Sequence, residues 1–152
     1  MKIIFLDIDG VLNSEIYDRQ RKDSDSNIDV SRLALVKELV DKSGARIVLS
    51  SSWRGHWDRD KEKMTAIGQE LDCVFSDAGL EIFDKTPMLS SRREEISVWL
   101  SSHPETEKFV IFDDMIFGWG ELAPRLVRTS ARIGRGLERT HIDTAYTLLT
   151  EA

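Results

Sequence analysis

The chain has 152 residues, of which 41% are hydrophobic and 32% are charged, and its formal net charge is −6. This size and composition predict one globular domain over residues 1–152, and the acidic balance gives no support to strong nonspecific binding of nucleic acid. No apolar run approaches the roughly 18 residues that a membrane-spanning helix requires, so we expect a cytoplasmic protein that does not bind membranes.

The first predicted elements are a strand, a polar segment and a helix. Residues 2–7 form a short apolar strand, and residues 13–28 are polar and aperiodic, which predicts an exposed loop or a small flap. Asp29 or Ser31 can cap a helix that ends at Gly44. Its apolar residues recur at helical spacing, at Val30, Leu33, Val36, Leu39 and Val40.

The middle of the chain continues this alternation. Residues 45–49 predict a second strand, and residues 58–71 predict a charged amphipathic helix that Gly68 weakens. Residues 73–75 predict a short third strand. The lone cysteine, Cys73, lies in this apolar run and is expected to be a small core residue, since one cysteine cannot form an internal disulfide bond.

The last predicted elements are a helix, two strands and a final helix, over residues 92–102, 109–112, 126–128 and 140–149. Ser90 or Ser91 can cap the first of these helices, and Ser91 with Glu94 has the spacing of a capping box. Strands that alternate with helices, several of them continuous apolar runs, predict an α/β fold. We expect a three-layer, Rossmann-like parallel sheet with helices on both faces.

Polar residues follow three of the predicted strands. Asp7 and Asp9 end the first strand, Ser50 follows the second, and Asp113 and Asp114 end the fourth. Any one of these groups could simply terminate its strand. Ligands of parallel sheets bind at the carboxyl ends of the strands, however, so their convergence predicts one acidic site. Such a site suits Mg²⁺, which prefers oxygen ligands and is often completed by a substrate phosphate.

The two acidic residues of the first strand stand two positions apart, so their side chains are expected to point to the same side. Two like charges held this close repel each other unless a cation lies between them. Gly10 follows and permits a positive φ or a close backbone approach. The pair therefore predicts a site for a metal ion, for acid–base chemistry, or for both.

A phosphate site also needs a fixed cation, for which there are three candidates. Arg92 precedes Ile96 by four residues and Trp99 by seven, so it shares their helical face toward the sheet. Lys85 lies in a stretch predicted to be irregular and ranks second, and Arg93 is expected to be a solvated surface charge. The Ser50 hydroxyl, the first one past its strand, is expected to contact a phosphate oxygen.

The segment that follows is rich in aromatic and basic residues. Trp53, Arg54, His56 and Trp57 could stack on a base or sugar and bind a second phosphate. Alternatively, Trp53 packs in the core and His56 is a solvated loop residue. We assign substrate binding to Ser51, Trp53 and Arg54.

Four segments together resemble the haloacid dehalogenase (HAD) superfamily of phosphotransferases. They read F-L-D-I-D-G-V-L-N, I-V-L-S-S-S-W-R, R-R-E-E-I-S-V-W-L and F-V-I-F-D-D, in chain order. The chain is most similar to the small HAD domains associated with bacterial and phage RNA-repair proteins, from Lys2 to about Leu137. The family usually carries lysine in its basic third motif, where this chain has Arg92.

The resemblance implies a role for each acidic residue. Asp7 would be the nucleophile that forms an aspartyl-phosphate, and Asp9 would protonate the leaving group and then activate water. Asp7, Asp9 (through its backbone carbonyl) and the Asp113/Asp114 pair would hold Mg²⁺, with Asp114 the more direct ligand of that pair. Ser50, Arg92 and Lys85 complete the predicted catalytic set. The implied activity is magnesium-dependent hydrolysis of a phosphomonoester.

The resemblance also bears on substrate and assembly. Both points at which the family inserts a cap domain hold only short segments here, so we expect a capless enzyme, or one with a minimal flap, and an open site. A nucleotide or a polynucleotide 3′-phosphate is the favoured substrate, and the chain is expected to be a monomer or a homodimer. Two alternatives stay open: a module that binds a phosphorylated ligand without turnover, and a small-metabolite phosphatase closed by dimerisation.

Overall fold

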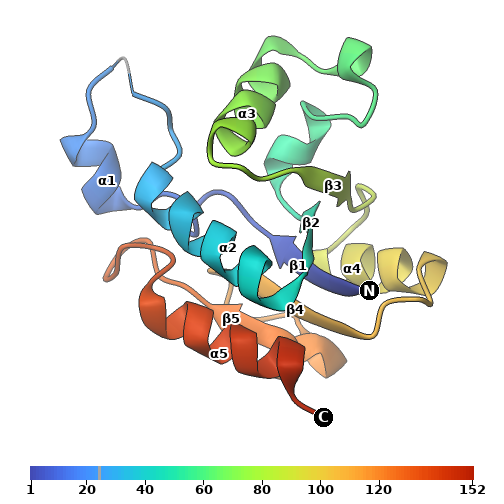
Figure 1. The fold of residues 1–152 in the computed structure, drawn as a ribbon. Coiled ribbons are helices and arrows are strands. Elements are labelled where there is room, and N and C mark those ends of the chain that lie inside the picture. The colour runs from blue at the N-terminus through green and yellow to red at the C-terminus, as the bar shows by residue number, and fades with distance from the viewer. Residues whose placement is uncertain (24) are drawn as a thin grey trace.

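The computed structural model describes residues 1–23 and 25–152; Ser24, within the predicted flap, lies outside the described residues. In this part of the chain a parallel sheet has the strand order β3-β2-β1-β4-β5 (Figure 1). The strands are β1 (Lys2–Leu6), β2 (Arg46–Leu49), β3 (Ile82–Lys85), β4 (Lys108–Asp113) and β5 (Leu126–Arg128). The α-helices are α1 (Glu15–Gln20), α2 (Val30–Ser43), α3 (Ala66–Asp77), α4 (Arg92–Ser102) and α5 (Arg139–Thr150). Short 3₁₀ helices are η1 (Ser52–Gly55), η2 (Lys61–Lys63) and η3 (Gly120–Arg125).

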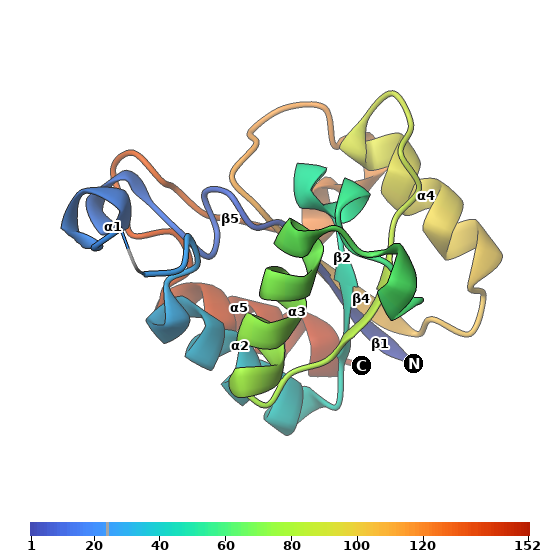
Figure 2. The same ribbon diagram turned by 90° about the horizontal axis from the view of Figure 1, so that it is seen from above.

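The sheet is buried on both faces, as its continuous apolar strands predict. Ile4 and Leu6 of β1 belong to a core cluster with residues of α2, α3 and α5. Ile3 and Phe5 point to the other face and pack against α4, where Phe5 meets Trp99 edge to face. Figure 2 shows the sheet between α2 and α5 on one side and α4 on the other. The predicted three-layer, Rossmann-like α/β fold is confirmed.

The capping residues set the ends of two helices as predicted. Asp29 accepts a hydrogen bond from the Ser31 backbone N–H and begins α2, and Gly44 ends that helix with a φ of 72°. Ser91 accepts a hydrogen bond from the Glu94 backbone N–H and begins α4. In the described residues, no helix is both long enough and apolar enough to cross a membrane.

The segment over residues 13–28 contains a helix, α1, which its aperiodic sequence does not predict. Ser14 begins this helix by accepting a hydrogen bond from the Tyr17 backbone N–H. The Tyr17 hydroxyl in turn lies 3.0 Å from the Ile28 carbonyl oxygen, which ties the helix to the end of the segment. Because Ser14 and Ile28 are buried, the segment is a compact flap rather than a fully exposed loop.

The predicted strand over residues 73–75 is wrong, because these residues belong to α3. Leu71 and Phe75, four residues apart, are both buried on one face of the helix. Cys73 lies between them and is exposed, so it is not a core residue. The third strand is β3, which starts seven residues after Phe75 and includes Lys85, a residue predicted to be in an irregular stretch.

Gly68 is required where α3 packs against the loop after β2. A Cβ atom at this position would lie 1.8 Å from the backbone oxygen of His56. We expect Gly68→Ala to destabilise the fold by about 2–3 kcal/mol, because backbone must move to relieve the clash. Alanine would otherwise gain about 1 kcal/mol of helix propensity. Urea denaturation tests this, with the exposed neighbour Gln69→Ala as control; a stabilised Gly68→Ala variant would contradict the packing.

Candidate active site

Three strands bring polar residues to one edge of the sheet. Asp7 directly follows β1, Ser50 directly follows β2, and Asp113 is the last residue of β4. The Asp7 backbone N–H donates to the Phe112 carbonyl (3.0 Å), and the Ser50 N–H donates to the Leu6 carbonyl (2.9 Å). The hydrogen bonding of the parallel sheet thus continues one residue past the ends of β1 and β2. It holds Asp7, Ser50 and Asp113 side by side.

Arg92, at the start of α4, connects all three of these residues. Its Nη1 atom donates to the Ser50 carbonyl (2.6 Å) and to Asp113 Oδ2 (2.9 Å), and it lies 3.2 Å from Asp7 Oδ1. The side chain is only 20% exposed. Of the three basic candidates, Arg92 is therefore the one that faces the acidic residues, while Arg93 is exposed and paired with Glu121.

The two buried carboxylates of the site have unusual proton affinities. Burial, and then the charge of Asp113, raise the pKa of Asp7 from 3.8 to about 7, against the opposing effect of Arg92. Burial also raises the pKa of Asp113. Asp7 and Asp113 together raise the pKa of Arg92, although burial of the guanidinium acts in the opposite direction. Without a further cation, the site thus has more negative charge than Arg92 offsets.

Asp9 does not share this environment, which corrects the expected repulsion between Asp7 and Asp9. Its side chain is exposed, and its two oxygens accept hydrogen bonds from Asn13 Nδ2 (3.1 Å) and Trp53 Nε1 (3.0 Å). The β1 strand ends at Leu6, so the period-2 alternation of a strand does not extend to Asp9. The carboxylate that repels Asp7 is Asp113 instead.

The oxygens of Asp7, Asp113 and Asp114 form a group that fits a metal ion. One carboxylate oxygen from each residue lies within 4.8 Å of the others, whereas the Asp9 carboxylate is not part of the group. Gly10 makes room for Asp114, because a Cβ atom there would lie 2.2 Å from Asp114 Oδ2. A set of carboxylate oxygens is the donor chemistry that Mg²⁺ prefers, so these residues fit that ion.

The Ser50 hydroxyl is buried without a partner. The residue is 1% exposed, and its Oγ atom forms no hydrogen bond with any residue in the described ranges. Buried hydroxyls almost always form a hydrogen bond. An unpaired hydroxyl next to Asp7 therefore indicates a position where a ligand binds. A phosphate oxygen is the acceptor that the sequence predicts for this hydroxyl.

Comparison with known proteins identifies the family of this chain. The model of a family described as the HAD domain in Swiss Army Knife RNA repair proteins matches residues 3–142. The chain belongs to this family. No curated protein and no solved structure matches the chain. The family match covers all of the site residues described above and confirms the resemblance that the four sequence segments indicate.

Two other basic residues of this HAD domain have structural partners that the sequence does not predict. Lys85 Nζ donates to the backbone carbonyls of Arg54 (3.0 Å) and Trp57 (2.7 Å) and so supports the loop after β2. Arg54 is 6% exposed and forms an ion pair with the buried Glu95. Both side chains thus support the structure next to the site, and Arg54 Nε is a buried donor that has no hydrogen-bond partner among the described residues.

Three further residues of the segment after β2, namely Ser51, Trp53 and Trp57, have different surroundings. Ser51 is fully buried, and its hydroxyl accepts a hydrogen bond from the Trp53 backbone N–H, so it begins η1. Trp57 is buried in the core, where its Nε1 donates to Asp72. Trp53 is half-buried and contacts Asp9, so it is the rim residue that remains available to a substrate.

We expect loss of Arg54 to weaken the fold rather than substrate binding. Arg54→Ala leaves the Glu95 carboxylate buried without its cation, which costs about 3–5 kcal/mol. Urea denaturation measures this loss. Joint replacement of Arg54 and Glu95 by leucine is expected to recover much of the stability. An Arg54→Ala variant with unchanged stability and a raised KM would instead assign the residue to substrate.

Thr129 is a residue of the site that the sequence analysis does not identify. It directly follows β5, is 1% exposed, and its hydroxyl donates to the Gly10 carbonyl (2.7 Å). Its backbone N–H donates to the Asp113 carbonyl. Thr129 thus links the loop after β1 to the end of β4. The same rule that singles out Ser50, a polar residue directly after an apolar strand, applies to Thr129 as well.

Proposed function

We propose that the chain is a magnesium-dependent phosphomonoester hydrolase that acts through an aspartyl-phosphate on Asp7. The observation that carries this proposal is the environment of Asp7, which is 4% exposed and lies among Arg92, Asp113 and the unpaired Ser50 hydroxyl. A buried carboxylate held between a cation and other carboxylates has the features of an activated nucleophile.

The two oxygens of Asp7 have different surroundings, which suits one of them for attack. Oδ1 accepts a hydrogen bond from the Ile8 backbone N–H (2.8 Å) and lies next to Arg92. Oδ2 accepts no hydrogen bond from the residues that the structure describes. In the proposed first step, Oδ2 attacks phosphorus and the bond to the leaving oxygen breaks. Asp9 donates its proton to that oxygen, so an alcohol leaves and Asp7 carries the phosphoryl group.

The second step returns Asp7 to its free form. Asp9, now ionised, takes a proton from water, whose oxygen attacks phosphorus and breaks the bond to Asp7. Its position for this task is fixed by the hydrogen bonds from Asn13 and Trp53. The products are inorganic phosphate and a protonated Asp9, which is ready for the next substrate.

Charge neutralisation is the main task of the remaining residues. Arg92 holds Asp7 and Asp113 in place and opposes the charge of the transferring phosphoryl group, and the Ser50 hydroxyl can donate to a phosphate oxygen. Asp7, Asp113 and Asp114 would hold Mg²⁺, with the Asp9 carbonyl as the fourth proposed protein ligand. When bound, the ion supplies positive charge that lowers the repulsion between the nucleophile and the phosphate.

The proposed substrate is a nucleotide or a polynucleotide that ends in a 3′-phosphate. Two observations support it: the family is one of HAD domains in RNA repair proteins, and Trp53 lies at the rim of the site. The flap over residues 13–28 is small, so the site is accessible to a long chain.

A substrate panel tests this proposal. We expect the purified protein with Mg²⁺ to release phosphate from 3′-phosphorylated oligonucleotides or mononucleotides faster than from sugar phosphates, and we expect chelation of the ion to stop release. Tight binding without release would favour the binding module. A preference for sugar phosphates, with a dimeric mass in solution, would favour the small-metabolite phosphatase.

Magnesium affinity should depend on pH through Asp7. A carboxylate must lose its proton to ligate the ion, and the pKa of Asp7 in the metal-free protein is raised to about 7 by burial and by Asp113. We therefore expect the affinity to fall roughly tenfold per pH unit below about pH 7 and to level off above it. Calorimetric Mg²⁺ titrations at several pH values measure this. An affinity that stays constant down to about pH 5 would contradict it.

A further inference from the structure

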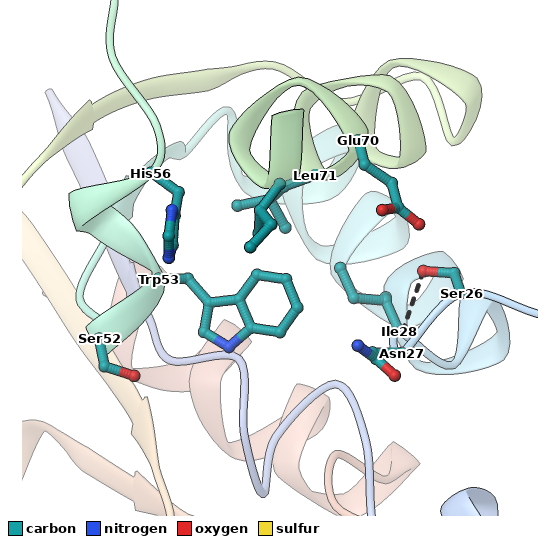
Figure 3. Close-up of a pocket in the computed structure, with 9 residues that line it drawn as sticks. Ser26, Asn27, Ile28, Ser52, Trp53, His56, Glu70 and Leu71 are labelled. Carbon is teal, nitrogen blue, oxygen red and sulfur yellow. Dashed lines mark hydrogen bonds between the residues drawn. The ribbon is translucent and has the colours of Figure 1, made fainter. Parts of the chain in front are cut away.

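A cavity of about 300 Å³ lies next to the proposed active site, between η1, the end of the flap and α3 (Figure 3). Trp53 lines it from η1 and His56 from the residue directly after η1; Asn27 and Ile28 line it from the flap, and Glu70 and Leu71 from α3. Its volume lies at the lower end of the range for small-molecule sites. None of these residues is part of the acidic group around Asp7.

The indole of Trp53 separates this cavity from the catalytic residues. Its Nε1 atom donates to Asp9 Oδ2 (3.0 Å), while its ring lines the cavity and lies near His56 and Leu71 in Figure 3. Asp9 is the proposed donor of a proton to the leaving oxygen. A leaving group that departs past Asp9 therefore extends across the indole into the cavity, an argument that rests on the proposed function.

The cavity is fixed in shape by contacts that do not involve a ligand. His56 Nδ1 lies 2.9 Å from Thr65 Oγ1, and Thr65 begins α3. Gly68 allows the first turn of α3 to approach the His56 carbonyl, where any side chain would clash. These contacts hold α3 against the segment that carries Trp53 and His56, so these two walls of the cavity are in place before substrate arrives.

The lining selects an uncharged ring and disfavours a second phosphate. Ile28 and Leu71 are buried apolar residues, Trp53 supplies an aromatic face on which a flat ring can stack, and His56 lies beside that face (Figure 3). Among the described residues that line the cavity there is no lysine or arginine, whereas the Glu70 carboxylate points toward Ser26 of the flap (Figure 3). A carboxylate repels an anion and accepts hydrogen bonds from N–H groups.

We propose that this cavity binds the base of the nucleotide whose phosphate lies at Asp7, and that it prefers bases with an exocyclic amino group. The ring stacks on the indole of Trp53 with His56 beside it, and the amino group donates to Glu70. The Asn27 side chain, which can both donate and accept, lies at the other wall. The substrate class is therefore a nucleoside monophosphate or the terminal nucleotide of a polynucleotide.

Variants of two exposed residues of α3 test the proposal. Ile67, which is 46% exposed and lines the cavity, can be replaced by tryptophan to fill it. We expect Ile67→Trp to lower kcat/KM for nucleotides relative to β-glycerophosphate, which has no ring, by about ten- to a hundredfold. The matched control is Val98→Trp on α4, where the side chain is 42% exposed and does not line the cavity. An unchanged ratio in Ile67→Trp would overturn the proposal.

Glu70→Gln is a second test that leaves the shape of the cavity intact. We expect kcat/KM for adenosine, cytidine and guanosine monophosphates to fall by about tenfold relative to uridine monophosphate, because an amide accepts these hydrogen bonds less strongly than a carboxylate. Both 3′- and 5′-monophosphates belong in the assay. An equal effect on all four bases would contradict recognition of the amino group by Glu70.

Binding to an inactive variant separates this proposal from the proposed function. Calorimetry with Asp7→Asn and adenosine 3′-monophosphate is expected to show binding that Ile67→Trp weakens. If nucleotides bind in this way but the unmodified protein does not hydrolyse them, the assignment of the cavity to a nucleotide base is supported and the proposed function is wrong. If β-glycerophosphate is hydrolysed, but nucleotides neither bind nor are hydrolysed with a higher kcat/KM than β-glycerophosphate, the proposed function is supported and the proposal for the cavity is wrong.

Discussion

Asp7→Asn is expected to abolish phosphate release from every substrate that the unmodified protein hydrolyses, a loss of about 10⁴-fold or more. An amide cannot form the acyl phosphate, although it keeps the shape of the side chain and can still accept the hydrogen bond from Ile8. Steady-state assays with an aryl phosphate and with a nucleotide measure this loss. Retained turnover would exclude Asp7 as the nucleophile.

The same variant should be more stable than the unmodified protein when no metal is present. Burial and Asp113 raise the pKa of Asp7 to about 7, so the folded state holds the proton more tightly than the unfolded chain does. Stability is therefore lost as the pH rises from about 4 to about 7, because ionisation favours the unfolded chain. Asparagine does not titrate, so we expect Asp7→Asn to gain about 2–4 kcal/mol at about pH 8.

Thermal unfolding in the presence of a chelator measures this gain. Asp77→Asn, at the exposed end of α3, is the matched control and is expected to change neither stability nor turnover. A gain in stability together with a loss of activity is typical of residues that are selected for chemistry rather than for folding. An Asp7→Asn variant that unfolds more readily would show that Asp7 mainly supports the structure.

Arg92→Met is expected to lower turnover by about 10²–10³-fold, the second largest effect. Arg92 reaches Ser50, Asp7 and Asp113 through a single nitrogen, Nη1, so its loss leaves two buried carboxylates without their shared cation. We also expect the variant to be less stable by about 3–5 kcal/mol, as for other broken buried ion pairs.

The conservative variant separates catalysis from folding. Because one nitrogen makes all of these contacts, a lysine ammonium can replace it, and we expect Arg92→Lys to keep turnover within about tenfold of the unmodified protein. Arg93→Met is the control on the same helix, since Arg93 is exposed and paired with Glu121. Equal losses in Arg92→Met and Arg93→Met would contradict the assignment of the phosphate-facing cation.

The convergence of the acidic residues and Ser50 could be predicted from the sequence, because it depends on a rule of topology rather than on side-chain detail. Apolar strands that end in polar residues place those residues at one edge of a parallel sheet. Helical spacing from Ile96 and Trp99 likewise identifies Arg92 correctly as the inward-facing cation. Both rules use the periodicity of regular elements, and such periodicity is strong in these segments.

The remaining features depend on contacts that no local pattern contains. The prediction of a strand at residues 73–75 is wrong because a short apolar run fits a helix as well as a strand. The four-residue spacing of the buried Leu71 and Phe75 indicates the helix that the structure contains. Arg54 resembles a phosphate ligand in sequence, but its partner Glu95 lies forty-one residues away. Similarly, Asp113 rather than Asp9 sets the charge around Asp7, which follows only from the three-dimensional arrangement.

The central claim is that Asp7 accepts the phosphoryl group, and the most direct test is to trap the acyl phosphate. In Asp9→Asn the second step lacks its base, whereas an aryl phosphate with a good leaving group needs no proton for the first step. Acid quenching with borohydride reduction then converts the phosphorylated residue to an alcohol that peptide mass spectrometry locates. The account predicts homoserine at position 7. Modification at Asp113 or Asp114, or no modification during turnover, would contradict it.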